Sequence, residues 1–241
     1  MEEQSEDPLA QARRYLADLV VFEGAKFVVP EEVKIEEIAA PNEAVATPQR
    51  AMATADGGTL EAFRQQICEC TRCGLGATRK QFVFGSGDPE AGIMFVGEAP
   101  GAEEDRQGEP FVGAAGQLLT KIIEAMGLRR EEVFICNILK CRPPNNRDPQ
   151  PDEIELCEPY LKRQIEIVQP QVICTLGRFA AQTLLRSSES MGRLRGQLHH
   201  YEGIPLVATY HPAALLRNPQ WKRPTWEDIK RVRQVYDGVA L

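Results

Sequence analysis

Residues 92–97, GIMFVG, form a short apolar run that ends in the turn EAPG at residues 98–101. Short apolar runs between turn residues are typical of strands buried on both faces. Further runs of this kind follow at residues 133–139, 171–176 and 205–209. Helical patterns separate the runs, over residues 114–126, 152–168 and 178–186. Strands that alternate with helices predict a three-layer α/β/α domain built on a central four-stranded parallel sheet.

The length and composition exclude several classes of protein. The chain has 241 residues, of which 43% are hydrophobic and 26% charged, as is typical of a soluble globular protein. No stretch approaches the roughly 18 uncharged apolar residues that a membrane span needs. The N-terminus, MEEQSEDPLAQ, is acidic where a secretory signal would be basic. We therefore expect a cytoplasmic monomer with no membrane partner.

The negative charge of the chain lies in its N-terminal quarter. Residues 1–60 hold 12 of the 35 acidic residues and 5 of the 28 basic ones, so their net charge is −7 and that of residues 61–241 is zero. Residues 28–58 are rich in Ala, Glu, Pro and Thr and cannot bury enough apolar surface to fold. We predict an acidic, largely disordered arm over residues 1–60, with one helix at residues 8–22 and an unknown partner, followed by a folded domain over residues 61–241.

The seven cysteines fall into two groups. Cys136 and Cys174 lie inside apolar runs and are expected to be small buried side chains. The others lie in or near loops, as the pairs Cys70 and Cys73, and Cys141 and Cys157, with Cys68 beside the first pair. In a cytosolic chain they favour a metal site over disulfides. Two pairs suit one four-cysteine site, and the spacing does not distinguish zinc from an iron–sulphur cluster.

Unusual residues follow the predicted strands. Ligands of such folds bind beyond the carboxyl ends of the strands. The residues found there are Glu98, Ala99, Asn137, Gly177 and His211. An Asn is disfavoured within a β run, which indicates a special position. We therefore expect a ligand site at this edge of the sheet.

Four blocks of sequence resemble one known family. They are GEAPGAEED (97–105), GEPFVGAAGQLL (108–119), NILKCRPPNNRDPQPDEIELC (137–157) and HPAALLR (211–217). In this order they are similar to the family 4 uracil-DNA glycosylases, the bacterial and archaeal iron–sulphur members of the uracil-DNA glycosylase superfamily. The resemblance implies hydrolysis of the N-glycosidic bond of deoxyuridine in single- or double-stranded DNA, which releases uracil and leaves an abasic site for base excision repair in a prokaryotic cytoplasm. It also implies a 4Fe–4S cluster held by Cys70, Cys73, Cys141 and Cys157.

The resemblance implies a role for each pocket residue. Phe111 would stack on the flipped uracil, and Asn137 would pair with its O4 and N3–H, a pattern that cytosine reverses. His211 would donate to uracil O2 as negative charge grows there. Backbone groups that line the pocket would come from Gly97, Glu98 and Ala99.

The turn after the first strand departs from the best-known branch of the superfamily, which carries GQDPYH there. In that branch the Asp positions water and the Tyr excludes thymine, but this chain has Ala99 and Gly101 instead. The acids that remain to orient water are Glu98, Glu103, Glu104 and Asp105. The sequence does not choose among them, and Glu98 joins Asn137 and His211 as the candidate catalytic residues. The segment AEEDRQGEPFVG lacks the His-containing insertion of the branch that traps DNA covalently, so we expect release of the base.

The segment after His211 is expected to contact DNA. In the superfamily this loop enters the minor groove, where Leu215 and Leu216 would fill the gap left by the flipped base beside Arg217. Arg142 would contact DNA from the cysteine loop, which the cluster would staple. A surrounding basic face is predicted from Lys140, Arg147, Lys222, Arg223, Lys230, Arg231 and Arg233.

Two other functions compete with this interpretation. The first is a non-enzymatic iron–sulphur nucleic-acid binder, such as a replication accessory protein, and the presence of Phe111, Asn137 and His211 argues against it. The second is a zinc-stabilised hydrolase of free nucleosides or nucleotides, which the groove-entering loop and the basic tail disfavour.

Deletion of residues 1–60 should leave excision of uracil from short oligonucleotides within a few-fold of normal. Every matching block lies beyond Cys70, and the arm's charge of −7 would repel phosphate. The measurement is the excision rate beside the melting temperature. A collapse of the rate with a native melting temperature would show that the arm contributes to the site.

Overall fold

The computed structural model describes residues 58–239. The predicted arm therefore lies almost wholly outside the described residues, and so does the helix expected at residues 8–22. Within the described part, the first element is the helix α2, Leu60–Ile67.

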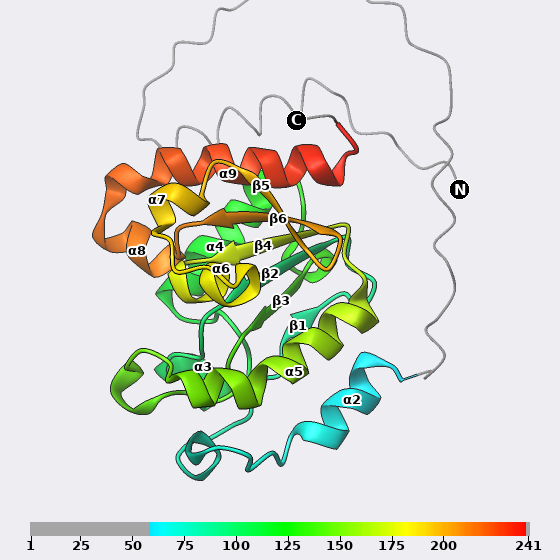
Figure 1. Cartoon of the computed structure of the whole chain (residues 1–241), viewed down its shortest axis with the longest axis vertical. Helices are drawn as coiled ribbons and strands as arrows, with labels where there is room; N and C mark the ends of the chain where they lie inside the picture. Colours follow the sequence, from blue (N-terminus) through cyan, green and yellow to red (C-terminus); the bar gives the residue numbers. More distant parts are fainter. Residues whose placement is uncertain (1–57, 240–241) are drawn as a thin grey trace, which may run out of the picture. The chain divides into compact units, whose positions relative to one another are not determined.

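The centre of the molecule is a sheet of six strands in the order β1-β3-β2-β4-β6-β5, which can be followed from one side of the view to the other in Figure 1. The four inner strands are parallel and confirm the predicted sheet: β2 (Ile93–Gly97), β3 (Phe134–Asn137), β4 (Val172–Leu176) and β6 (Ile204–Thr209). All residues of β2, β3 and β4 are buried, which explains why these strands are continuous apolar runs rather than alternating ones.

Two antiparallel edge strands were not predicted. β1 (Ser86–Gly87) has only two residues, and β5 (Leu198–Tyr201) is mostly exposed and contains two histidines. β5 joins β6 through Glu202 and Gly203, both with positive φ (48° and 85°). Two positive φ values in a two-residue loop are typical of a tight hairpin turn, in which glycine is favoured.

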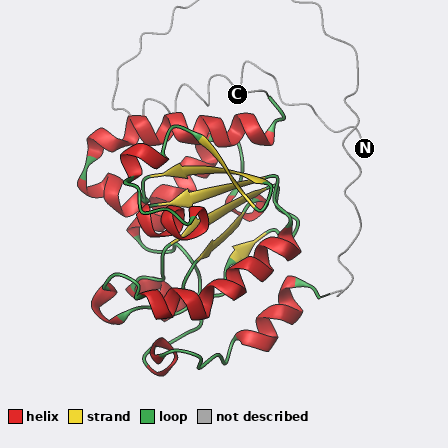
Figure 2. Cartoon of the chain, viewed as in Figure 1, coloured by secondary structure: helices red, strands yellow, loops and turns green. Residues whose placement is uncertain are grey.

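Helices cover both faces of the sheet, as Figure 2 shows. On one face, α2, α5 (Pro151–Val168) and α6 (Arg178–Leu185) share a core with Met94, Val96 and Ile173. On the other face, α9 (Lys222–Tyr236) packs on β4 and β6, and α4 (Ala114–Ala125) contacts α8 (Pro212–Arg217). The short helices α3 (Ala102–Gln107) and α7 (Met191–Leu194) complete the layers.

The three helices predicted over residues 114–126, 152–168 and 178–186 begin and end within one residue of the predicted bounds, whereas α9 was not predicted. Helix α5 starts with Pro151 at its first position, and Gln150 N–H donates to Glu153 at 2.9 Å across the first turn. It ends at Gln169, which has φ 49° and precedes a proline. No helix of the described part is long and apolar enough to span a bilayer.

The connections bring the carboxyl ends of the inner strands to one edge. The chain leaves β2 through α3 and α4 to reach β3, and then crosses through α5 to β4 on the other side of β2. This change of direction creates a switch point beside β2, where ligands of open α/β sheets bind.

Candidate active site

Gly97, Asn137 and Phe111 meet at the carboxyl end of β2. Gly97 is the last residue of β2 and lies in register with Asn137, the last residue of β3. A Cβ atom on Gly97 would overlap Asn137 Oδ1 and would lie 2.6 Å from Phe111 Cζ. Only glycine permits this approach. The structure therefore brings together three of the predicted pocket residues.

Asn137 carries an unpaired acceptor. It is 2% exposed, and its Oδ1 atom has no hydrogen-bond partner within residues 58–239. Most buried polar atoms are paired, and an unsatisfied one costs about 1–3 kcal/mol. Its backbone is fixed, because its carbonyl accepts from Lys140 Nζ at 2.6 Å and Ile138 N–H donates to Gly97 O at 3.0 Å. A fixed, unpaired acceptor is what a ligand N–H would complete.

Phe111 is held in a strained conformation. Its φ is 51°, in the left-handed region that few residues other than glycine adopt, and its side chain is buried. Glu104 Oε1 accepts from Val112 N–H and Gly113 N–H, each at 2.9 Å. Gly116 lies against the Phe111 carbonyl, and a Cβ atom on Gly116 would overlap the carbonyl oxygen. Both sides of the loop are thus fixed, and no local sequence signal had indicated this role for Glu104.

His211 stacks on Phe111, with 5.5 Å between ring centroids and 29° between planes. It caps α8, and its Nδ1 accepts from Ala213 N–H at 3.1 Å. The proton of the neutral ring is therefore on Nε2. The pKa of His211 is lowered to about 4, chiefly by burial and also by the charge of Arg217, while Glu104 acts in the opposite direction. At pH 7 the ring is a neutral donor.

Glu98 is half-buried at the end of β2. Its pKa is raised to about 7, chiefly by burial and also by the charge of Asp148, while Arg178 acts in the opposite direction. The other three acids of the segment have structural partners. Glu103 pairs with Arg106, Glu104 holds the Phe111 loop, and Asp105 accepts from Lys80 N–H at 2.9 Å. Glu98 is therefore the acid best suited to exchange a proton near neutral pH.

The fold brings the two cysteine segments together. Cys141 and Cys157 are buried, and both lie within electrostatic range of Cys73. Arg79 joins the segments, because its Nη1 donates to Cys70 O at 2.5 Å and to Cys141 Sγ at 3.5 Å. Tyr160 OH donates to Cys70 Sγ at 3.2 Å. In the described part, no three His, Cys, Asp or Glu side chains are close enough to hold a single metal ion.

This donor set fits a cluster, because Cys141 lies within electrostatic range of Cys70 and Cys73, Cys157 lies within range of Cys141 and Cys73, and hydrogen-bond donors point at the Cys70 and Cys141 sulphurs. Burial raises the pKa of Cys157 to about 11, so the free thiol stays protonated at neutral pH and iron binding would displace the proton. Cys136 and Cys174 are fully buried in β3 and β4, which confirms the expectation that they pack as small apolar side chains.

Lys140 corrects the predicted basic face. It is 0% exposed, and its Nζ donates to Asn137 O at 2.6 Å and to Gln164 Oε1 at 2.5 Å. Its backbone N–H donates to Cys157 Sγ at 3.4 Å. Lys140 therefore connects the cysteine loop to Asn137 and is not a surface residue. Its position in the sequence between Asn137 and Cys141 could have indicated this role. It was assigned to the surface because a Lys is rarely buried.

The expected DNA-contact residues divide by exposure. Leu215 is 0% exposed and cannot enter a groove, whereas Leu216 is 50% exposed and Arg217 is exposed. Arg142 is half-buried, and its Nε donates to Asn146 at 2.8 Å. Arg147, Arg231 and Arg233 pair with Glu153, Asp228 and Asp237. Of the two leucines that were expected to enter the groove, Leu216 alone is exposed.

Comparison with known proteins identifies the class. Residues 84–230 match the model of the uracil DNA glycosylase superfamily. The type-4 uracil-DNA glycosylase of Archaeoglobus fulgidus is 45% identical over 185 residues, which cover 73% of this chain and 93% of the relative. That of Saccharolobus solfataricus is 47% identical over 191 residues (76% and 88%), and that of Thermotoga maritima 42% over 178 residues (72% and 93%). The chain therefore belongs to the uracil-DNA glycosylase superfamily and, within it, to the type-4 group.

The two leucines of α8 should respond differently to truncation. Leu215→Ala opens a cavity in the core and should lower the free energy of unfolding by about 2–5 kcal/mol. Leu216→Ala should change it by less than about 0.5 kcal/mol but weaken binding to uracil-containing duplex DNA. Denaturant unfolding and DNA binding measure the two effects. Equal destabilisation by both variants would contradict the assignment.

Proposed function

We propose that this chain is a monofunctional glycosylase that hydrolyses the N-glycosidic bond of deoxyuridine in DNA and releases uracil. The observation that carries the proposal is the unpaired Oδ1 of Asn137, which lies with the edge of the Phe111 ring at the position that a Cβ atom on Gly97 would fill. One acceptor, one aromatic face and one close backbone approach are the parts needed to hold a flipped, planar base. The names of the type-4 relatives support the same activity.

Base recognition would rest on Asn137 and Phe111. Oδ1 would accept from uracil N3–H, and Nδ2 would donate to O4. Cytosine offers an N3 acceptor and an N4 amino group instead, so both contacts would become repulsive or unpaired. The Phe111 ring would stack on the base, held in place through Glu104.

Departure of the base would rest on His211. As the glycosidic bond breaks, its electron pair moves to the base, and negative charge grows on O2. The neutral Nε2–H of His211 would donate to that oxygen, because Nδ1 is already engaged by Ala213 N–H. Glu98 as a carboxylate would orient water and stabilise the positive charge that develops on the sugar, and it would accept the proton that the water loses as its oxygen bonds to the sugar carbon.

We propose that Cys70, Cys73, Cys141 and Cys157 hold a 4Fe–4S cluster. Base excision moves no electrons, so the cluster would have no redox role in the reaction. It would instead link the two cysteine loops covalently. Lys140 supports this role, because it contacts both the Cys157 sulphur and the Asn137 carbonyl. The link would therefore fix the backbone that carries the base-reading side chain.

The direct test is incubation with an oligonucleotide that contains one uracil, followed by alkali. Strand breakage at the uracil, without breakage before alkali, is expected of a monofunctional glycosylase. Oligonucleotides with cytosine or thymine at the same position serve as controls. If the uracil-containing strand stays intact after alkali, the proposal is wrong and a DNA-binding role without catalysis is favoured.

His211→Ala should lower the single-turnover excision rate by about 10²–10³, because one donor to a developing oxyanion is lost. Binding to DNA that carries a non-cleavable uracil analogue should fall far less, since the charge appears only as the bond breaks. A rate loss that merely follows the loss of affinity would refute the leaving-group role.

The pH profile of kcat/KM should report Glu98. The carboxylate is ionised above its pKa of about 7 and protonated below it, so kcat/KM should rise about tenfold between pH 6 and 8. Glu98→Gln should be slower and should lack this rise. His211 should add no step above pH 5, because its pKa is about 4. An unchanged rise in Glu98→Gln would assign the titration to another group.

The protein with its cluster should be brown, with charge-transfer absorbance near roughly 400 nm and about four irons per chain. Cys157→Ala should bleach this colour, and the matched variant Cys174→Ala should keep it, because Cys174 is buried in β4 among apolar side chains. Absorbance and iron content of anaerobically purified protein decide the question. A colourless wild-type protein that contains only zinc would contradict the cluster.

A further inference from the structure

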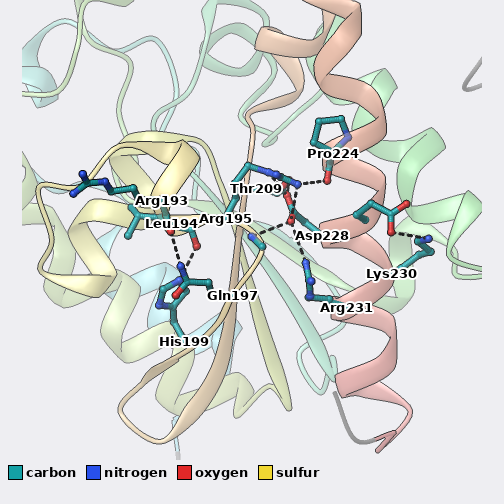
Figure 3. Close-up of polar contacts among 12 residues, drawn as sticks. Arg193, Leu194, Arg195, Gln197, His199, Thr209, Pro224, Asp228, Lys230 and Arg231 are labelled. Carbon is teal, nitrogen blue, oxygen red and sulfur yellow. Dashed lines mark hydrogen bonds and ion pairs between the residues drawn. The ribbon is translucent and has the colours of Figure 1, made fainter.

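Asp228, on α9, is a buried carboxylate with several partners. Its side chain is 0% exposed, and its partners come from β6, from residues 195–196 and from α9 itself. Oδ2 accepts from Thr209 Oγ1 at 2.8 Å and from Arg195 Nε at 3.0 Å. Oδ1 accepts from Arg195 Nη2 at 3.0 Å and from Gly196 N–H at 3.2 Å. Figure 3 shows Arg195, Thr209 and Arg231 converging on Asp228.

Arg195 also contacts Tyr210, the residue that follows Thr209. The Arg195 guanidinium lies over the Tyr210 ring, 5.6 Å from its centroid. Trp221 also contacts the Tyr210 ring and stacks on it, with 4.6 Å between centroids and 11° between planes. Arg195 Nη2 also donates to Pro224 O at 2.5 Å at the start of α9. Thr209 and Tyr210, the two residues that precede His211, are therefore both anchored to α9 or to the residues just before it.

Stability alone does not account for this arrangement. A buried ion pair contributes little net stability, because its attraction is offset by the desolvation of two charges. A bidentate pair fixes geometry well, since both partners have defined directions. We infer that Asp228 is a positioning residue for His211, which acts by fixing Thr209 and Tyr210 at the end of β6.

The path from Asp228 to His211 is short. The Thr209 carbonyl accepts from Gly177 N–H at 2.8 Å, so this residue is held through both its side chain and its backbone. Gly177 in turn lies against His211, since a Cβ atom there would be 3.0 Å from His211 Cβ. With Nδ1 engaged by Ala213, the direction of Nε2 depends on where Thr209 and Tyr210 set the backbone.

This inference rests on the proposed leaving-group role of His211, and the experiment separates the two. Thr209→Val keeps the shape of the side chain and removes the hydroxyl that Asp228 accepts from. Thr209→Ser keeps the hydroxyl and is its matched control. Asp228→Asn removes the charge. Glu227→Gln breaks an exposed ion pair with Lys230 beside it on α9 and controls for general effects of charge on this helix.

Each variant is made in the wild-type chain and in the His211→Ala chain, and single-turnover excision, binding to a non-cleavable uracil analogue and the melting temperature are measured. Thr209→Val and Asp228→Asn should slow excision about tenfold in the wild-type chain with little change in affinity, because a small misplacement of a catalytic group is costly. In the His211→Ala chain they should cause no further loss. Thr209→Ser and Glu227→Gln should behave as wild type.

Equal slowing by Thr209→Val in both backgrounds would overturn the inference, as would a loss of affinity or melting temperature without a loss of rate. If Asp228→Asn does not fold, Thr209→Val decides the question by itself. If His211→Ala itself excises normally, the leaving-group role fails and the positioning role fails with it. If His211→Ala is slow but Thr209→Val is normal, only the positioning role fails.

Discussion

The close approach of Asn137 and Phe111 at Gly97 is the contact on which the site depends. The register of β2 and β3 sets Gly97 opposite Asn137, and the missing side chain leaves room for an amide and an aromatic ring. A methyl group there would move one or the other. The switch in chain direction beside β2 explains why the contact occurs at this edge of the sheet rather than elsewhere.

Phe111, Asn137 and His211 each have support from another part of the chain. Glu104 of α3 holds the Phe111 loop, Lys140 holds the Asn137 backbone, and Asp228 of α9 holds the strand end before His211. All three supports are charged groups that bond to backbone or hydroxyl groups. Directional bonds of this kind set the positions of groups more sharply than apolar packing does, which suits a site whose rate depends on orientation.

The sequence was sufficient for the inner sheet, for the helices α4, α5 and α6, and for the grouping of Gly97, Asn137 and Phe111. Strong apolar periods and specific motifs identify such features locally. It was insufficient where a role depends on contacts between distant segments. Leu215 and Leu216 are equivalent in sequence, and only the packing of α8 on α4 decides which one is buried.

The same limit applies to charged residues. A Lys in a loop is usually exposed, so Lys140 was assigned to a basic surface, and its burial follows from acceptors supplied by β3 and α5. The sequence pattern does not indicate the two edge strands, because β1 has only two residues and β5 contains polar residues. The role of Asp228 had no local sequence signal either, because Thr209 and Arg195 lie 19 and 33 residues away from it in the chain.

The unpaired oxygen of Asn137 has a consequence for how the protein would search DNA. An N–H that reaches this atom forms a bond without breaking another within the protein, so the gain is larger than in an ordinary exchange of partners. A cytosine that reaches it brings a lone pair against a lone pair. Cytosine would then be refused by electrostatic repulsion rather than by lack of room, and it would return to the stack without any dedicated barrier.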